Sequence, residues 1–97
     1  MSDVLVREDE QSVIGADGEV LREYDDVVLL RSVKSCAAGN VTVDVVCAGT
    51  TGTIIMVLAN DLVDIECDVS PGKFAFAQEE PTQLRLVRRR EEKLKHA

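Results

Sequence analysis

Three carboxylates that alternate along the chain, Asp64, Glu66 and Asp68, form the most regular set of side chains able to do chemistry. A carboxyl group works as a general acid when an apolar cleft raises its pKa. Here apolar residues fill the intervening positions, so residues 62–69 have the period of two that indicates a β-strand. One face of this strand then carries Val63, Ile65, Cys67 and Val69, and the other carries the acids. We expect the acidic face to meet water or a basic partner, and we expect no catalytic residue.

The cysteines and the histidine do not have the spacing of a metal site. Structural zinc sites take their ligands in close pairs, whereas Cys36, Cys47 and Cys67 are 11 and 20 residues apart and His96 lies at the end of the chain. A cysteine nucleophile would need a nearby base, which these positions do not supply. We expect no metal and no cofactor. The odd number of cysteines disfavours a secreted disulfide scaffold and favours buried, reduced thiols in the cytoplasm.

Gly49 and Gly52 bracket a turn that resembles a phosphate-binding loop in composition only. Such loops need a helix N-terminus or a lysine after the glycines. A strand-like run, residues 53–58, follows instead. We interpret the glycines as residues required by backbone geometry or by close packing.

The basic residues at the C-terminal end are the candidate nucleic-acid contacts. No aromatic residue lies among them to stack on a base. They could instead form a solubilising tail or dock on the acidic N-terminal arm. These residues are Arg88, Arg89, Arg90, Lys93 and Lys95.

Charge is distributed unevenly along the 97 residues. Residues 1–26 carry nine acids and two bases, residues 27–82 carry seven acids and three bases, and residues 83–97 carry six bases and two acids. An acidic body with a basic end indicates contact between the two ends or a basic protein partner. The N-terminus lacks the pattern of a signal peptide, and the longest apolar run is too short to span a membrane.

The remaining chain predicts short strands. The strand expected at residues 27–33 is apolar at successive positions until Arg31, as in a strand buried on both faces. Residues 34–40 are expected to form a loop, and residues 41–46 an additional strand or an extended edge. After residues 53–58, a reversal at 59–61 leads into the acidic strand. Two further strands are expected at 73–78, with Phe74 and Phe76 on one face, and at 83–88, with Leu84 and Leu86 inward.

The N-terminal residues carry weaker signals. Residues 1–11 are expected to be a mostly disordered tail, of which Val4 to Val6 could dock on the body. The Asp17-Gly18 pair predicts a minor hairpin, with an irregular arm as the alternative. The domain division that follows is a flexible acidic arm at 1–23, a β-domain at 24–88 and a basic tail at 89–97. The fold class is all-β, with about five short strands in a small barrel or a partly open sandwich.

Four stretches resemble a bacterial family of small SH3-like barrel proteins of unknown function. They are D-V-V-L-L at 26–30, A-G-T-T-G-T-I-I at 48–55, V-D-I-E-C at 63–67 and Q-L-R-L at 83–86. The glycine turn and its strand also resemble the KOW element of ribosomal and transcription proteins. The acidic arm and the segment 35–47 depart from the family pattern. The resemblance implies a fold, an SH3-like barrel, and a role as an immunity protein or antitoxin, because such proteins are encoded near toxins.

Together these features predict a non-catalytic protein-binding module with a basic protein, such as a toxin, as its partner. The expected partner-binding residues are Asp44, Asp64, Glu66 and Asp68. The alternative is a KOW-like module that binds nucleic acid or the ribosome through the basic end. A homodimer remains open, because the exposed strand edges of small barrels can pair.

Overall fold

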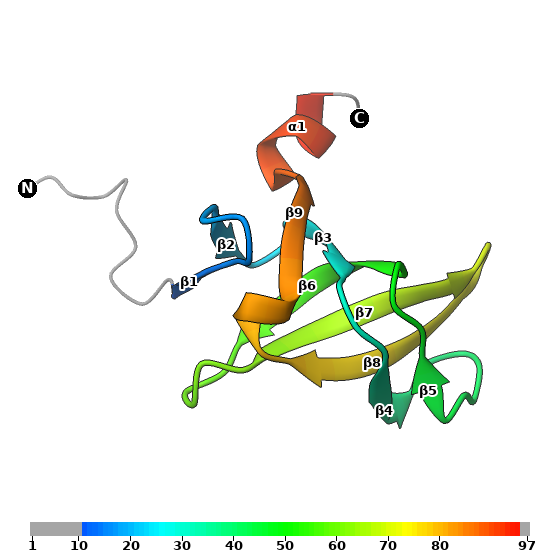
Figure 1. Cartoon of the computed structure of the whole chain (residues 1–97). Helices are drawn as coiled ribbons and strands as arrows, with labels where there is room; N and C mark the ends of the chain where they lie inside the picture. The colour runs from blue at the N-terminus through cyan, green and yellow to red at the C-terminus, as the bar shows by residue number, and fades with distance from the viewer. Residues whose placement is uncertain (1–10, 96–97) are drawn as a thin grey trace, which may run out of the picture.

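A curled antiparallel sheet of seven strands forms the body of the protein (Figure 1). The computed structural model describes residues 11–95, without the side chains of residues 94 and 95. The order of strands across the sheet is β5-β4-β8-β7-β6-β3-β9. Its strands are β3 (Asp26–Leu29), β4 (Val33–Ala38), β5 (Val45–Val46), β6 (Thr51–Val57), β7 (Val63–Ser70), β8 (Lys73–Glu79) and β9 (Leu84–Arg88).

The remaining elements lie at the two ends of the described chain. Strands β1 (Ser12–Ile14) and β2 (Val20–Arg22) form a separate two-stranded sheet. The 3-10 helix η2 (Pro81–Gln83) precedes β9, and the helix α1 (Arg90–Lys95) follows it. The all-β class is therefore confirmed. The expectation of about five strands is too low, because β4, β5 and the hairpin add strands where the sequence signals were weak.

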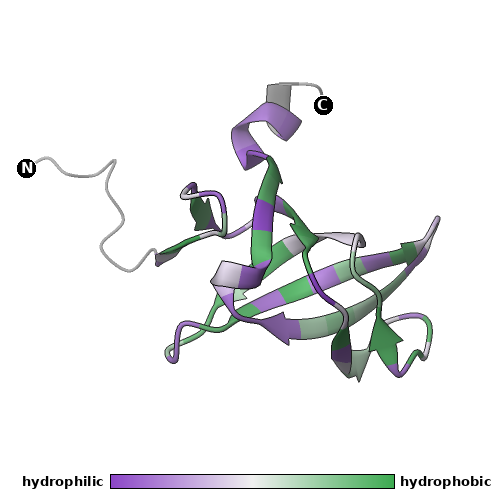
Figure 2. Ribbon diagram, in the orientation of Figure 1, coloured by the Kyte–Doolittle hydropathy of each residue, from purple (hydrophilic) through white to green (hydrophobic). Residues whose placement is uncertain are grey.

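The core lies on one side of the curled sheet. Val63, Ile65 and Cys67 of β7 are fully buried there, as their alternation predicts. Figure 2 shows the same alternation of hydrophobic and hydrophilic residues along β7. On β8 the small residues Ala75 and Ala77 face the core, so Phe74 and Phe76 lie together on the opposite side. The other core residues are Leu21, Val27, Leu29, Val46, Ile54 and Leu84.

Strand β3 is buried on one face only, which corrects the prediction of a strand covered on both faces. Val27 and Leu29 are buried, but Val28 is half-buried and Leu30, past the end of the strand, is exposed. The reason is that this antiparallel sheet packs on the core with a single face, so alternate residues of β3 point away from it.

The prediction of a loop at residues 34–40 is wrong for residues 34–38 and holds only for residues 39 and 40. Strand β4 covers Val33–Ala38 and pairs with β8 and β5. Pairing across the sheet satisfies the backbone of a segment whose residues have little strand propensity of their own, so the tertiary context overrides the local signal. The expected strand at 41–46 is reduced to the two residues of β5.

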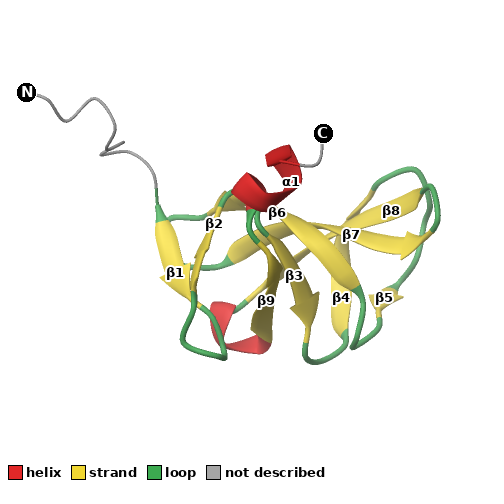
Figure 3. Cartoon of the chain, turned by 90° about the horizontal axis from the view of Figure 1, so that it is seen from above, coloured by secondary structure: helices red, strands yellow, loops and turns green. Residues whose placement is uncertain are grey.

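The predicted hairpin around Asp17 and Gly18 is confirmed as the antiparallel pair β1 and β2, and the alternative prediction of an irregular arm is wrong. Leu21 of β2 is fully buried in the core, and Val13 of β1 packs against it. The backbone amide of Ala16 donates to the carbonyl oxygen of Leu84 at 2.8 Å, which joins the hairpin to β9 (Figure 3). Residues 1–10, including the proposed docking of Val4 to Val6, lie outside the described residues.

Candidate binding face

The three alternating acids of β7 lie on the side of the sheet away from the core. Asp64 and Glu66 are half-buried and Asp68 is exposed. Val69 was expected on the core face, and this prediction is wrong, because Val69 is 36% exposed. The pairing register of β7 shifts between Asp68 and Ser70, which ends the alternation there.

Aromatic residues of β8 lie directly beside two of these acids. Glu66 is the cross-strand neighbour of Phe76, and Asp68 is the neighbour of Phe74. Directly opposed residues in an antiparallel pair have Cβ atoms about 5 Å apart, so each carboxylate stands next to a ring. The two rings contact one another edge to face, with their centroids 5.6 Å apart and an interplanar angle of 80°.

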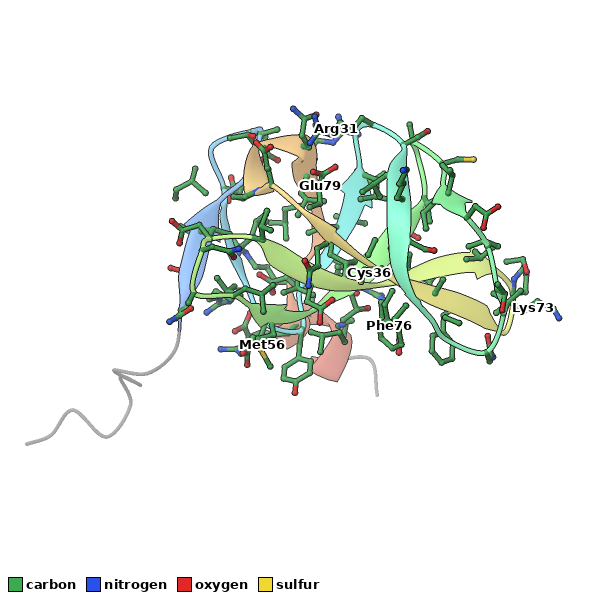
Figure 4. The ribbon with its side chains drawn as sticks, turned by 90° about the horizontal axis from the view of Figure 1, so that it is seen from below. Arg31, Cys36, Met56, Lys73, Phe76 and Glu79 are labelled. Atoms are coloured by element: carbon green, nitrogen blue, oxygen red, sulfur yellow. The ribbon has the colours of Figure 1, made fainter. Side chains whose placement is uncertain are left out.

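Strand β6 borders the acids on their other side. Met56 is the neighbour of Asp64 and is 47% exposed. In Figure 4, Met56 and Phe76 lie along the same margin of the molecule as the red helix α1. We call this surface the acidic–aromatic face, and we define it by Met56, Asp64, Glu66, Asp68, Phe74 and Phe76.

The connection between β4 and β5 holds Phe74 in place. The side chain of Asn40 accepts a hydrogen bond from the backbone amide of Phe74 at 2.8 Å and donates one to the carbonyl oxygen of Gly72 at 2.7 Å. Gly39 lies against the ring so closely that a Cβ atom at this position would overlap it. The aromatic part of the face is therefore supported by fixed backbone contacts.

The acids of this face have no cationic partner within the described residues. None of Asp64, Glu66 and Asp68 forms an ion pair there. Burial raises the pKa of Asp64, and a backbone hydrogen bond from Ile65 opposes this effect. Ionisation of Asp64 is therefore less favourable in the folded state, and no cation among the described residues offsets this effect.

Asp44, the fourth predicted partner-binding residue, is not brought to this face by any contact. It is exposed in the connection between β4 and β5, where its carbonyl oxygen accepts a hydrogen bond from the amide of Ser35 at 3.1 Å. Strand β8 separates β4 from β7 in the sheet.

The predicted nucleic-acid-binding residues pair with acids of the same chain. Arg88 and Lys93 contact the carboxylate of Asp26 at 3.3 and 3.0 Å. Arg89 contacts Glu19 at 2.9 Å and Asp25 at 3.3 Å. The docking of the basic end on the acidic arm, left open by the sequence, is confirmed for Arg89. Arg90 pairs with Glu91 at 3.4 Å, and the side chain of Lys95 is not described.

Asp25 organises this end of the molecule, and the sequence analysis missed it. Its carboxylate is fully buried and accepts hydrogen bonds from the backbone amides of Arg22 and Arg90, both at 3.0 Å. With the Arg89 contact, one side chain joins β2, the start of β3 and the start of α1. An acidic residue just before an apolar strand was the available signal, but a surface acid would have the same sequence context.

A second buried carboxylate, Glu79 at the end of β8, was also missed. It forms a two-point contact with Arg31, with distances of 3.1 Å to Nε and 2.9 Å to Nη2 (Figure 4). Hydrogen bonding to Glu79 is the main cause of the raised pKa of Arg31. The geometry is that of a structural ion pair.

A groove separates the acidic–aromatic face from the basic end. Its volume is about 390 Å³, and Asp68 borders it on one side while Asp26, Val87 and Arg88 border it on the other. Thr51 and Gly52 complete the lining.

The glycines of the turn before β6 are explained by geometry, as predicted. Gly49 has a φ angle of +90°, which side chains other than glycine rarely adopt. Gly52 lies within β6, where a Cβ atom would come within 2.7 Å of both the carbonyl oxygen of Glu66 and the side chain of Ile65.

The prediction of buried thiols is correct only for Cys67. Burial raises the pKa of this thiol to about 12. Cys36 and Cys47 are exposed, because Cys36 lies at a register shift of β4 and Cys47 follows the end of β5. In the part of the chain that the structure describes, no three His, Cys, Asp or Glu residues are grouped to hold a metal ion, and His96 lies outside it.

No protein-family model, curated protein or solved structure matches this chain. Among residues 11–95, no helix is long and apolar enough to cross a membrane.

Proposed function

We propose that this protein is a non-catalytic binding module whose acidic–aromatic face contacts a basic protein. The observation that carries the proposal is the contrast between two groups of acids. Those near the basic end pair with arginine or lysine, whereas Asp64, Glu66 and Asp68 form no ion pair among the described residues. A partner with positive charge would complement them, and such complementarity speeds association and selects partners.

The composition of the face supports a protein as the partner. Aromatic residues and methionine are enriched in protein interfaces, and this face offers two phenylalanines and an exposed methionine on paired strands. Residues 1–82 carry sixteen acids and five bases, so the body as a whole attracts a cationic protein.

The more specific proposal is that the chain is an SH3-like barrel acting as a bacterial immunity protein or antitoxin that neutralises a basic toxin. It rests on the resemblance of four stretches and on the acidic face. A cytoplasmic location is part of this proposal, and the free thiols of Cys36 and Cys47 are consistent with a reducing compartment.

The KOW-like alternative, a nucleic-acid or ribosome-associated module, has less support. It needs Arg88, Arg89 and Lys93 to contact phosphates, and these side chains contact Asp25, Asp26 and Glu19 instead. Binding to nucleic acid would have to break these contacts.

The test uses two variants with the same change in net charge. Glu66→Lys/Asp68→Lys reverses acids on the face, and Asp17→Lys/Glu23→Lys reverses two acids elsewhere that form no ion pair among the described residues. A protein captured by the wild-type chain from its native host is identified and purified, and its affinity for each variant is measured by calorimetry. We expect the face variant to weaken binding at least about tenfold and the control to change it less than about threefold. Equal affinities for the two variants would reject the proposed face.

A further inference from the structure

We propose that the acidic–aromatic face is selective for arginine over lysine, with Glu66, Asp68 and Phe76 as the residues that recognise a guanidinium group. This inference rests on the proposed function and specifies the chemistry of the partner. It makes an arginine-bearing segment the expected occupant of the face.

The register brings the two kinds of group that a guanidinium needs to the same place. Glu66 stands opposite Phe76, and Asp68 stands opposite Phe74 in the next outward-facing pair. A guanidinium is planar, so it can donate two hydrogen bonds to one carboxylate while its flat face stacks on a ring. A lysine ammonium is a compact and strongly hydrated charge that cannot do both.

Phe76 is the ring on which the guanidinium can stack. Phe74 is covered by Gly39, which lies directly against its ring, and it contacts Phe76 edge to face. Phe74 and Phe76 are both half-buried, and Phe76 stands directly opposite Glu66, with the exposed Asp68 at the diagonal position. The backbone contacts of Asn40 hold this arrangement before any ligand binds, which reduces the entropic cost of binding.

The groove beside Asp68 provides space for the rest of the segment. At about 390 Å³ it can accept a side chain next to the Asp68 carboxylate. On its far wall the guanidinium of Arg88 already contacts the carboxylate of Asp26 at 3.3 Å. The chain therefore contains one example of guanidinium–carboxylate pairing in this groove, and Asp68 is the lining carboxylate without such a partner.

The test compares hexa-arginine with hexa-lysine, which carry the same number of side-chain charges. Binding to the full chain is measured by calorimetry at low and moderate salt, and the contacted amides are mapped by NMR. We expect hexa-arginine to bind about three- to fivefold tighter, the size of a partly exposed cation–π contribution. The largest amide shifts are expected in β7 and β8.

Three variants separate the contributions. Phe76→Leu should reduce the preference to less than about twofold while leaving hexa-lysine affinity within about twofold, because only pairing with the carboxylates then remains. Phe76→Tyr should keep the preference because the ring remains. Glu66→Gln/Asp68→Asn should weaken both peptides. Thermal unfolding of each variant shows whether it is folded at the temperature of the binding measurement.

Equal affinity for the two peptides, a preference that Phe76→Leu leaves unchanged in the folded variant, or binding that maps away from β7 and β8 would overturn arginine selectivity. Failure of both peptides to bind would also overturn it. None of these results decides the proposed function, because the affinity of the captured partner for Glu66→Lys/Asp68→Lys is a separate measurement.

Discussion

Two aspartates of this protein show how one side-chain type acquires opposite roles. Asp25 is fully buried but has two backbone donors and an arginine, so its charge is compensated where it lies. Asp64 is only half-buried, yet burial is the main influence on its pKa, and no cation among the described residues offsets it. The first arrangement holds segments together, and the second keeps a charge available for a partner at some cost to the folded state.

Substituting Asp64 should therefore produce a pH-dependent gain in stability. Because burial raises the pKa of Asp64 above its ordinary value of 3.8, the folded state favours the protonated form. The protonated form of Asp64 therefore stabilises the folded state. This stabilisation is fully present below the pKa of Asp64 in the unfolded chain, and it is lost as the pH rises through the higher pKa in the folded state. Asp64→Asn should thus become increasingly stable relative to wild type as pH rises from about 3 to about 7.

Urea unfolding at a series of pH values measures this difference. Asp44→Asn, in the connection between β4 and β5, controls for the loss of one negative charge. A difference between Asp64→Asn and wild type that stays constant with pH, or that shrinks as pH rises, would contradict the burial argument.

Gly49, in the turn before β6, and Gly52, within β6, are required for two different reasons. Gly49 needs its positive φ angle, and nothing lies within 4 Å of the position of a Cβ atom. Gly52 has no such angle to satisfy. Glycine is required here because backbone and side-chain atoms of β7 lie so close that a Cβ atom at position 52 would overlap them. Paired strands approach most closely where a side chain is missing, which lets β6 lie against Ile65 and Cys67.

Two substitutions at each glycine distinguish these reasons. Gly52→Ala should reduce the free energy of unfolding by about 1–3 kcal/mol through overpacking, and Gly52→Asn should be no better. Gly49→Ala should cost about 1–2 kcal/mol through backbone strain, and Gly49→Asn should cost less, because asparagine tolerates positive φ angles. Urea unfolding provides all four values. If Gly52→Ala had the same free energy of unfolding as the wild-type protein, β6 and β7 would be able to move apart without cost, which would contradict the overpacking argument.

The molecule as a whole has two regions of different electrostatic character. At one end, Asp25, Asp26 and Glu19 pair with Arg88, Arg89 and Lys93, and the ends of the described chain are joined. Across the groove, the acids of β7 have no such partners among the described residues. The acids without an ion-pair partner on β7 therefore lie on the side that we assign to binding.

Removing Asp25 should loosen both ends together. Asp25→Ala leaves the amides of Arg22 and Arg90 without their acceptor and removes one of the contacts of Arg89, and we expect a loss of about 2–4 kcal/mol. Hydrogen exchange should accelerate in β2 and α1 and remain slow in the paired strands β7 and β8. Asp44→Ala is the matched control and should change stability by less than about 0.5 kcal/mol. Faster exchange in α1 without any change in β2 would refute the joining role.

The period of two at residues 62–69 was sufficient to predict β7, its outward acids and its core face as far as Cys67, because alternation along a strand depends only on the local backbone geometry. The need for glycine at position 49 was predictable for the same reason, because a positive φ angle is a local property, whereas the crowding at Gly52 comes from β7. The all-β class follows from several such short signals. In contrast, β4 could not be predicted, because its hydrogen bonds come from β8, more than thirty residues away in the chain.

Only the tertiary structure decides which charges are available. The sequence contains eighteen acids and eleven bases, and nothing in their order shows that Arg89 reaches Asp25 or that Glu66 stands beside Phe76. It could not show either that Cys67 is the buried thiol and Cys36 an exposed one. These distinctions depend on long-range register and on the curl of the sheet. Charge and composition predicted a basic partner, and the register of the sheet determines which acids would be available to one.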